Sequence, residues 1–310
     1  MEVFVERATA QAEGLGLLPD ERHRSAFRAF TRLAGHVYPY VPLERLLVLS
    51  QVERALYLVD DAGDDDPHVG ESAERTRLLV TRALARLMGA ADPPASAVER
   101  GLDRVAAELR AHEPWPGWYR AFVTGFADYC HQGLSIALAC NRRGEAPHPE
   151  TYLRLRRHDS GMYLTQYLGV GFALGEPLSA EALASPLVAG LVEATIDQVA
   201  LCNDLMSYHK EVVRRGTLWN AVAVFERHEG LSRAAAVDRV VALCNGAVTR
   251  FEAQEAAVLD SALGADAGVR RFVAGQKLWM AGHLAFAAET PRYADPLGEE
   301  SAVSSGRATP

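Results

Sequence analysis

Apolar residues recur at spacings of three and four along almost the whole chain, whereas strict alternation over the length of a strand is hard to find. This period is typical of amphipathic helices, which bury an apolar stripe against a core. A clear case begins at Pro42, and its apolar positions are Leu43, Leu46, Leu47, Leu49, Val52, Leu56 and Val59. The pattern therefore predicts an all-α protein.

Clusters of proline and glycine separate the helical patterns, and the connections between them are short. Besides the helix from Pro42, the pattern predicts helices over residues 71–88, 95–112, 118–143, about 150–174, 179–215, 218–228, 232–259 and one ending near residue 290. We see no linker rich in proline, serine or glycine before residue 293 and no repeat of fixed period. We predict one helical domain over residues 1–293 and a disordered tail over residues 294–310.

Several of these helices are nearly uncharged on all faces, which is typical of helices at the centre of a bundle. With 310 residues, of which 49% are hydrophobic and 23% charged, the chain can bury a large core. The expected architecture is a single helical bundle, and such a bundle can enclose an apolar cavity.

The charge of the chain excludes some classes of partner. The formal net charge of −8 argues against a nucleic-acid surface, which needs a basic excess to neutralise phosphates. Glu2, Glu6 and Arg7 stand where a secretory signal would need an apolar run, so we expect no export segment. The longest uncharged stretch, residues 160–175, is too short for a membrane-spanning helix. We therefore expect a cytoplasmic protein without membrane insertion.

An acidic cluster ends the helix that starts at Pro42. It runs from Asp60 to Asp66, where a helix C-terminus already carries partial negative charge, so a cation should compensate. Asp60 and Asp64 are four residues apart and project from one face if the helix continues, which suits oxygen ligation of Mg²⁺. Taken alone, the cluster also fits a solvated acidic loop.

A second polar group lies late in a long apolar helix. Asn203, Ser207 and Glu211 are spaced four and four, so on a helix they lie within about 80 degrees of one another. One carboxylate and two neutral oxygens suit a hard metal ion and leave positions for water and phosphate. Lys210, beside this stripe, can meet an anion. The alternative interpretation is that these three residues form the solvent-exposed face of the helix.

Together, DDAGD at 60–64 and NDLMSYHKE at 203–211 resemble the paired metal motifs of class I terpene synthases, the bacterial terpene cyclases. The family patterns are DDxxD and (N/D)DxxSxxxE, and both are matched without substitution. The resemblance extends from about residue 38 to Tyr293. It implies the class I helical bundle around an apolar active-site cavity and three Mg²⁺ ions, with Asp60, Asp64, Asn203, Ser207 and Glu211 as ligands.

The resemblance also implies catalytic residues outside the metal motifs. The segment LRRHDSGMY at 155–163 is similar to the one in which the family carries its diphosphate-sensing arginine, a linker and a helix-break effector. By position these are Arg157, Ser160 and Gly161. The segment GHLAFAAETPRY resembles the family's closing segment, whose Arg-Tyr pair is Arg292 and Tyr293 here. The implied diphosphate-binding residues are Arg157, Lys210, Arg292 and Tyr293.

Four aromatic residues are candidates for a pocket that folds an isoprenoid and stabilises cations, although aromatics at helical spacing are also typical of plain core. They are Tyr57, Trp219, Trp279 and Phe286. Phe286 stands where the family often has tryptophan, and His283 where asparagine is common. Both departures can change the shape of the pocket.

The resemblance implies a Mg²⁺-dependent terpene cyclase that ionises a linear allylic isoprenyl diphosphate and cyclises the carbocation to a terpene hydrocarbon or alcohol, with release of diphosphate. Farnesyl diphosphate is the expected substrate. Geranyl and geranylgeranyl diphosphate stay open as substrates, the latter for a diterpene cyclase, and a homodimer is possible. A chain-elongating prenyl diphosphate synthase is the nearest rival, but it normally has a second DDxxD. A non-catalytic helical interaction protein would leave the stripe at 203–211 without a use.

Overall fold

The computed structural model describes residues 1–14, 18, 21–64 and 71–290 of the chain. Within these ranges the protein is helical and contains no strand, which confirms the all-α prediction. The α-helices are α1 Glu2–Gly14, α2 Glu21–Val37, α3 Leu43–Asp64, α5 Ala73–Met88, α6 Ala97–Ala111, α7 Trp118–Asp128, α8 Ser135–Arg143, α9 Pro149–Asp159, α10 Met162–Leu164, α11 Val170–Leu174, α12 Ala180–Ala184, α13 Pro186–Tyr208, α14 Ala221–Glu229, α15 Arg233–Asp260 and α16 Ala267–Glu289. The tail predicted to be disordered lies outside the described residues.

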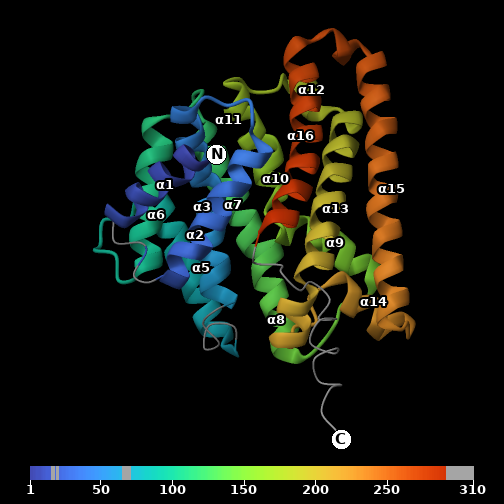
Figure 1. Ribbon diagram of the computed structural model, residues 1–310. Helices are drawn as coiled ribbons and strands as arrows, with labels where there is room; N and C mark the ends of the chain where they lie inside the picture. Colours follow the sequence, from blue (N-terminus) through green and yellow to red (C-terminus); the bar gives the residue numbers. More distant parts are fainter. Residues whose placement is uncertain (15–17, 19–20, 65–70, 291–310) are drawn as a thin grey trace, which may run out of the picture.

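The helices form a bundle with two sides that meet along α2 and α16. On one side α13 packs against both α15 and α16, and Figure 1 shows these three long helices side by side. On the other side α3 packs against α2, α5 and α6. Within the described ranges, no helix combines the length and the apolar character needed to cross a membrane.

Helix α13 is buried on nearly all sides because its first five turns carry almost no charged residue. The sequence analysis predicted one helix over residues 179–215, but the structure divides this range into α12, α13 and a π-helical segment. The break falls at Pro186, which has no N–H and therefore starts a new helix, while the Ser185 hydroxyl accepts a hydrogen bond from the Leu187 N–H.

Two N-terminal helices precede those that the sequence analysis identified. Helix α1 buries Phe4, Val5 and Ala8 and packs against α2 and α3. Helix α2 in turn packs against α16. The N-terminal helices thus connect α3 with α16, the last helix of the chain that the structure describes.

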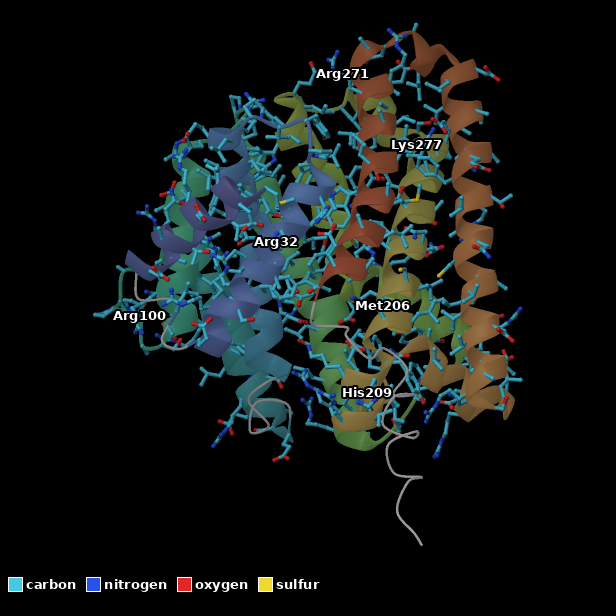
Figure 2. The ribbon with its side chains drawn as sticks, viewed as in Figure 1. Arg32, Arg100, Met206, His209, Arg271 and Lys277 are labelled. Carbon is cyan, nitrogen blue, oxygen red and sulfur yellow. The ribbon has the colours of Figure 1, made fainter. Side chains whose placement is uncertain are left out.

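Helix α16 shows the amphipathic division that the pattern predicted. Phe272, Trp279 and Phe286 are buried, whereas Arg271 and Lys277 project from the outer surface (Figure 2). Lys277 pairs there with Glu255 of α15 at 2.8 Å. The apolar face of α16 is therefore available to line the interior.

In the described part of the chain, three π-helical segments interrupt the helices of the interior: η1 Tyr129–Leu134, η2 Thr165–Gly169 and η3 His209–Arg214. The residue after η1 and the residue after η2 each donate a backbone hydrogen bond to a carbonyl five residues earlier. Ser135 N–H donates to the Cys130 carbonyl, and Val170 N–H donates to the Thr165 carbonyl. A π turn holds one more residue than an α turn and is frequent at functional sites. Each of the three segments contributes at least one residue to the cavity described next.

Candidate active site

A cavity of about 530 Å³ lies between α3, η1, α9, α13 and α16. Pockets of about 300–1,000 Å³ enclose small organic ligands. Its apolar lining includes Leu56, Leu134, Leu138, Met162, Val199 and Trp279. Carboxylate, amide and guanidinium groups line other parts, so the cavity combines a surface for hydrocarbon with a surface for charge.

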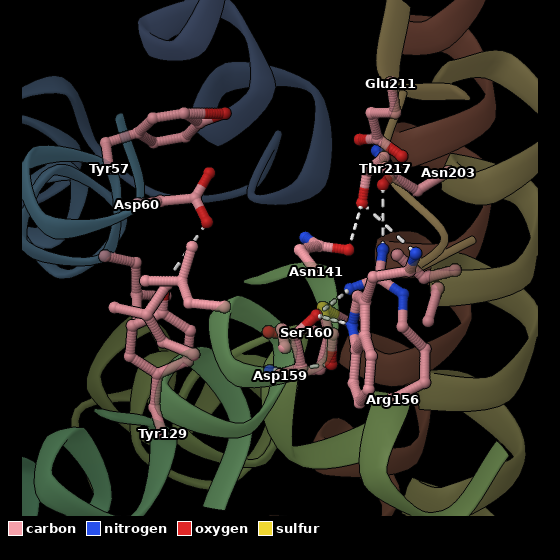
Figure 3. Close-up of a pocket in the computed structure, with 18 of the residues that line it drawn as sticks. Tyr57, Asp60, Tyr129, Asn141, Arg156, Asp159, Ser160, Asn203, Glu211 and Thr217 are labelled. Carbon is pink, nitrogen blue, oxygen red and sulfur yellow. Dashed lines mark hydrogen bonds and ion pairs between the residues drawn. The ribbon is translucent and has the colours of Figure 1, made fainter. Parts of the chain in front are cut away.

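The α3 wall presents Asp60 to the cavity. Leu56, Tyr57 and Asp60 all line it, as residues three and four apart share one helical face. The Tyr129 hydroxyl donates a long hydrogen bond of 3.4 Å to the Asp60 carboxylate (Figure 3). Asp64 is the last residue of α3, and its side chain lies outside the described part of the structure.

The opposite wall carries the second motif, and Asn203 and Glu211 line the cavity there (Figure 3). The helix changes from α to π after Tyr208, so Glu211 belongs to η3 rather than to a regular α-helix. Burial, followed by the nearby Asp204, raises the pKa of the Glu211 carboxyl, while the Arg156 charge, the Ser207 hydroxyl and the Asn220 amide partly offset this rise.

The donor atoms of the two walls fit a hard divalent cation. Ser207 is buried, and its hydroxyl makes no well-formed hydrogen bond to another described residue, although it lies close enough to Glu211 to favour the carboxylate. Burial and, further, the Asp60 charge raise the pKa of Asp159, although Arg156 opposes this, and the result is about 6. Carboxylates and neutral oxygens gathered around one space are the ligands that Mg²⁺ takes.

This candidate metal site is divided between the walls. Among the described residues, no three aspartate, glutamate, histidine or cysteine side chains lie close enough to hold a metal ion by themselves. The arrangement suits metal ions that are held by protein oxygens on each side and by the oxygens of a bound diphosphate between them.

Arg156 faces this cavity and joins α9 to the second motif. Its guanidinium donates hydrogen bonds of 2.9 Å to Asn203 Oδ1, Asp204 Oδ1 and Asp159 Oδ2. The sequence analysis did not select Arg156. The only signal for it was its place beside Arg157 in the same RR pair.

Arg157, which the family resemblance marks as the diphosphate sensor, points to another part of the structure. Its guanidinium binds Asp197 through two hydrogen bonds of 2.7 and 2.8 Å and Glu193 through one of 2.6 Å. It is absent from the cavity lining, whereas Arg156 is present. In this conformation the arginine of α9 that can meet an anion in the cavity is Arg156.

Asp204, inside the second motif, is fully buried and positions its neighbours. It accepts hydrogen bonds from the Tyr152 hydroxyl at 2.6 Å, from the Ala221 N–H at 3.0 Å and from Arg156. These contacts fix α13 against α9 and α14. Asp204 therefore supports the motif rather than lining the cavity.

The helix break at Gly161 is present as the resemblance implies. Gly161 has a φ of 66°, a left-handed conformation that favours glycine, and it separates α9 from α10. Its carbonyl accepts a hydrogen bond of 3.3 Å from the Thr165 N–H. The neighbouring Ser160 lines the cavity and donates a hydrogen bond to the Arg157 carbonyl.

The basic residues that line the cavity differ from those expected from the sequence to bind diphosphate. Lys210 lies in η3 but is not part of the cavity lining, whereas Arg142 and Arg215 are. These two arginines were not selected from the sequence, because no spacing distinguishes them from surface residues. Arg292 and Tyr293 lie outside the described residues.

Three of the four aromatic candidates line the cavity: Tyr57, Trp219 and Trp279. Phe286 does not, and its ring lies instead 6.3 Å from that of Phe30. His283 does line the cavity, and burial, together with the Arg156 charge, lowers its pKa to about 4. Its imidazole is therefore neutral at neutral pH.

The fold and the two facing motifs define a class I terpene synthase. Residues 54–250 match the model of terpene synthase family 2, C-terminal metal binding, and the chain belongs to this family. The matched residues include both motifs, at 60–64 and 203–211.

Individual relatives are distant. The chain is 26% identical to an alpha-muurolene synthase of Coprinopsis cinerea over 86% of its own length, but it spans only 63% of that protein. It is 28% identical to a 4-epi-cubebol synthase of Streptosporangium roseum, named as (2E,6E)-farnesyl diphosphate cyclizing, over 89% of this chain and 81% of that one. The linalool/nerolidol synthase of Streptomyces clavuligerus has the same fold, with a TM-score of 0.78, 22% identity and coverage of 92% of this chain and 98% of that one.

Proposed function

We propose that this protein is a Mg²⁺-dependent terpene cyclase that ionises farnesyl diphosphate and cyclises the resulting cation to a sesquiterpene hydrocarbon or alcohol. The observation that carries the proposal is the placement of Asp60 across an apolar cavity from Asn203 and Glu211. The choice of farnesyl diphosphate is supported by the similarity to the 4-epi-cubebol synthase, which is named as farnesyl diphosphate cyclizing.

Cleavage of the allylic carbon–oxygen bond leaves a pyrophosphate whose charge must be neutralised. Three bound Mg²⁺ ions would supply this neutralisation as Lewis acids. Asp60 and Asp64 would hold them on one wall, and Asn203, Ser207 and Glu211 on the other.

Cationic side chains would complete the diphosphate site through charge-assisted hydrogen bonds. The described arginines that line the cavity are Arg142, Arg156 and Arg215. The resemblance adds the cations Arg157, Lys210 and Arg292, together with the neutral hydroxyl of Tyr293. For Arg157 this role requires that the guanidinium leave Asp197 when the substrate binds.

The rest of the cavity would receive the hydrocarbon. Its apolar side chains exclude water, which would otherwise quench the cation early. The rings of Tyr57, Trp219 and Trp279 line the same space, and an aromatic face attracts positive charge. At the helix break, the Gly161 carbonyl is a dipole that would favour the cation once the site closes.

The experiment that tests the function incubates purified protein with C10, C15 and C20 isoprenyl diphosphates, with Mg²⁺ or with EDTA, and analyses the extract by gas chromatography and mass spectrometry. Cyclic product from the C15 substrate with Mg²⁺ only supports the proposal. Cyclic product from the C20 substrate alone would favour a diterpene cyclase. Longer diphosphates after addition of isopentenyl diphosphate would favour a prenyl-chain elongating enzyme, and no product would contradict all three.

We also propose a cytoplasmic location and a homodimer, as the family resemblance implies. Sedimentation of the purified protein over a range of concentrations tests the second point. A single species of monomer mass at all concentrations would contradict it.

A further inference from the structure

The position of Trp219 in the cavity wall depends on side-chain contacts rather than on a helix. Its backbone lies in the non-helical connection between η3 and α14. Thr217 ties this connection to α8, because its hydroxyl donates a hydrogen bond of 2.6 Å to Asn141 Oδ1 and accepts one of 3.1 Å from the Trp219 backbone N–H. The direction of the indole therefore depends on what its ring and its own N–H contact.

Two residues of α9 hold this indole. Trp219 Nε1–H donates a hydrogen bond of 2.7 Å to Asp159 Oδ2, and the Tyr152 ring packs against the indole in a T-shaped arrangement with 5.3 Å between centroids. Tyr152 is itself fixed, since its hydroxyl donates to the buried Asp204. Trp219 is only 7% exposed, so its ring has little room to turn. Helix α9 thus sets the direction of an aromatic ring that belongs to a distant part of the chain.

The oxygen of Asp159 that accepts from the indole also accepts a hydrogen bond of 2.9 Å from Arg156 (Figure 3). Arg156, Asp159 and Trp219 all line the cavity. The indole N–H and the guanidinium that can meet the diphosphate therefore lie on either side of one oxygen atom. Asp159 stands where the charged part of the cavity meets the hydrocarbon part, which is where a diphosphate bound by Arg156 would separate from its allylic carbon.

The charge of Arg156 does not by itself account for Asp159. The fully buried Asp204 already accepts a hydrogen bond of 2.9 Å from Arg156 Nε. The shorter of the two hydrogen bonds on Asp159 Oδ2 comes from the indole, which is a neutral donor. The carboxylate therefore serves the ring of Trp219 as well as the arginine.

We propose that Asp159 is a positioning residue, which holds the indole of Trp219 against the newly formed allylic cation and so determines which product this cation gives. The inference rests on the proposed function, because it requires a cation in the cavity. An indole that donates to a carboxylate carries more negative charge on its ring, and the face of such a ring attracts a cation more strongly. The hydrogen bond also keeps the ring in one rotamer, so the cavity has one shape when the diphosphate leaves.

The first measurement needs no substrate. The indole N–H signals of the four tryptophans are recorded by NMR of isotope-labelled protein, and Trp219→Phe identifies the signal of Trp219. In Asp159→Ala this proton signal should move upfield, because a hydrogen bond to a carboxylate shifts such a proton downfield. The signal of Trp118, whose indole N–H donates to the Leu168 carbonyl at 3.1 Å, should stay in place. Asp159→Asn keeps an acceptor of the same size and should give a smaller upfield movement.

The second measurement compares the products formed from farnesyl diphosphate with Mg²⁺. We expect the ratio of the main product to the others to change at least about 5-fold in Asp159→Ala and less in Asp159→Asn, as the loss of a cation–π contact predicts. Asp159→Ala combined with Trp219→Phe should give the same ratio as Trp219→Phe alone, because Asp159 acts through the indole. Glu99→Gln is the matched control and should keep the wild-type ratio, because Glu99 is a buried carboxylate that pairs with Arg82 outside the cavity lining.

An unmoved Trp219 signal in Asp159→Ala would overturn the inference, and so would a wild-type product ratio in that variant. A further change of the ratio in the double variant would also overturn it, since Asp159 would then act independently of the indole. If Asp159→Ala does not fold, Asp159→Asn decides by the same two measurements. Failure of the proposed function looks different, because the wild-type enzyme would then form no product while the Trp219 signal would still respond to Asp159→Ala.

Discussion

Arg156 donates a hydrogen bond of 2.9 Å to the side-chain oxygen of Asn203. This oxygen is one of the proposed metal ligands, so in the present conformation a cation already occupies one of its lone-pair directions. A carbonyl oxygen has two such directions. Arg156 can therefore orient the amide for a metal ion and remain in place to meet the diphosphate.

The first prediction concerns the metal ligands. Replacing Asp60, Asn203 or Glu211 by alanine removes an oxygen donor without removing a large apolar group, so the fold should survive. We expect diphosphate release to fall at least about 100-fold in each variant. Release measured with a coupled phosphate assay, alongside thermal unfolding, checks this. Wild-type turnover in any of the three would remove that residue from the metal site.

The second prediction separates the two arginines of α9. Arg157→Lys loses the bidentate contact with Asp197. This ion pair is partly exposed, so it contributes only about 1 kcal/mol or less to stability. If Arg157 binds diphosphate after closure, turnover should still fall at least about 10-fold while thermal stability stays near wild type. Unchanged turnover in Arg157→Lys, with a loss in Arg156→Lys, would assign the contact to Arg156 alone.

The third prediction concerns the buried support of the second motif. Asp204→Asn removes the charge that accepts hydrogen bonds from Arg156, Tyr152 and Ala221. We expect a loss of about 3 kcal/mol in the free energy of unfolding, because a buried guanidinium loses one of its two counter-ions and keeps only Asp159. Tyr152→Phe deletes only one of these bonds and should cost less, about 1–2 kcal/mol. Urea unfolding of both variants measures the difference, and equal losses would contradict this account.

The fourth prediction uses two glycines of similar conformation. A methyl group at Gly161 would lie 2.8 Å from Leu56, whereas one at Gly144 would meet nothing within 4 Å. Both have positive φ, so alanine costs about 1–2 kcal/mol at either position. Gly161→Ala should also displace Leu56, which lines the cavity, and therefore alter the product ratio. Gly144→Ala should lower stability alone.

The fifth prediction is a dependence of stability on pH. Folding raises the pKa of Glu53 from its ordinary value of 4.5 to about 7, so folding favours the protonated form. The stabilisation is complete below the lower value and is lost as the pH rises through about 7. Relative to Glu53→Gln, the wild-type protein should lose up to about 3 kcal/mol between about pH 4 and pH 8. Unfolding curves for both proteins across this range measure the loss, and a difference independent of pH would refute the raised pKa.

The helical class could be predicted from sequence, and so could the candidate metal ligands that face one cavity, because both depend on local spacing. Asp60 and Asn203 each belong to a short motif that can be recognised from its spacing alone, and both residues line the same cavity. The choice between Arg156 and Arg157 could not be made in this way. Adjacent helical residues differ by about 100 degrees in direction, and which one faces the cavity depends on how α9 packs on α13.

Glu53 illustrates a second reason why parts of the cavity could not be predicted from the sequence. In the segment from Gln51 to Tyr57 it stands beside Arg54 among apolar residues, and a charged pair at that position is typical of a solvated helix face. The structure nevertheless buries Glu53 and places the Tyr38 hydroxyl beside it. A residue becomes unusual through its surroundings, which belong to distant parts of the chain.

The three π turns give the cavity a sensitivity that side-chain substitutions do not capture. Each turn contains one residue more than an α turn, so deletion of a single residue from η1, η2 or η3 can restore a regular helix locally. If a π turn becomes an α turn without such a deletion, the residues that follow rotate by about 100 degrees and present other side chains to the interior. Changes of register at η1 and η2, which lie outside both metal motifs, are thus a route by which one bundle can acquire differently shaped interiors.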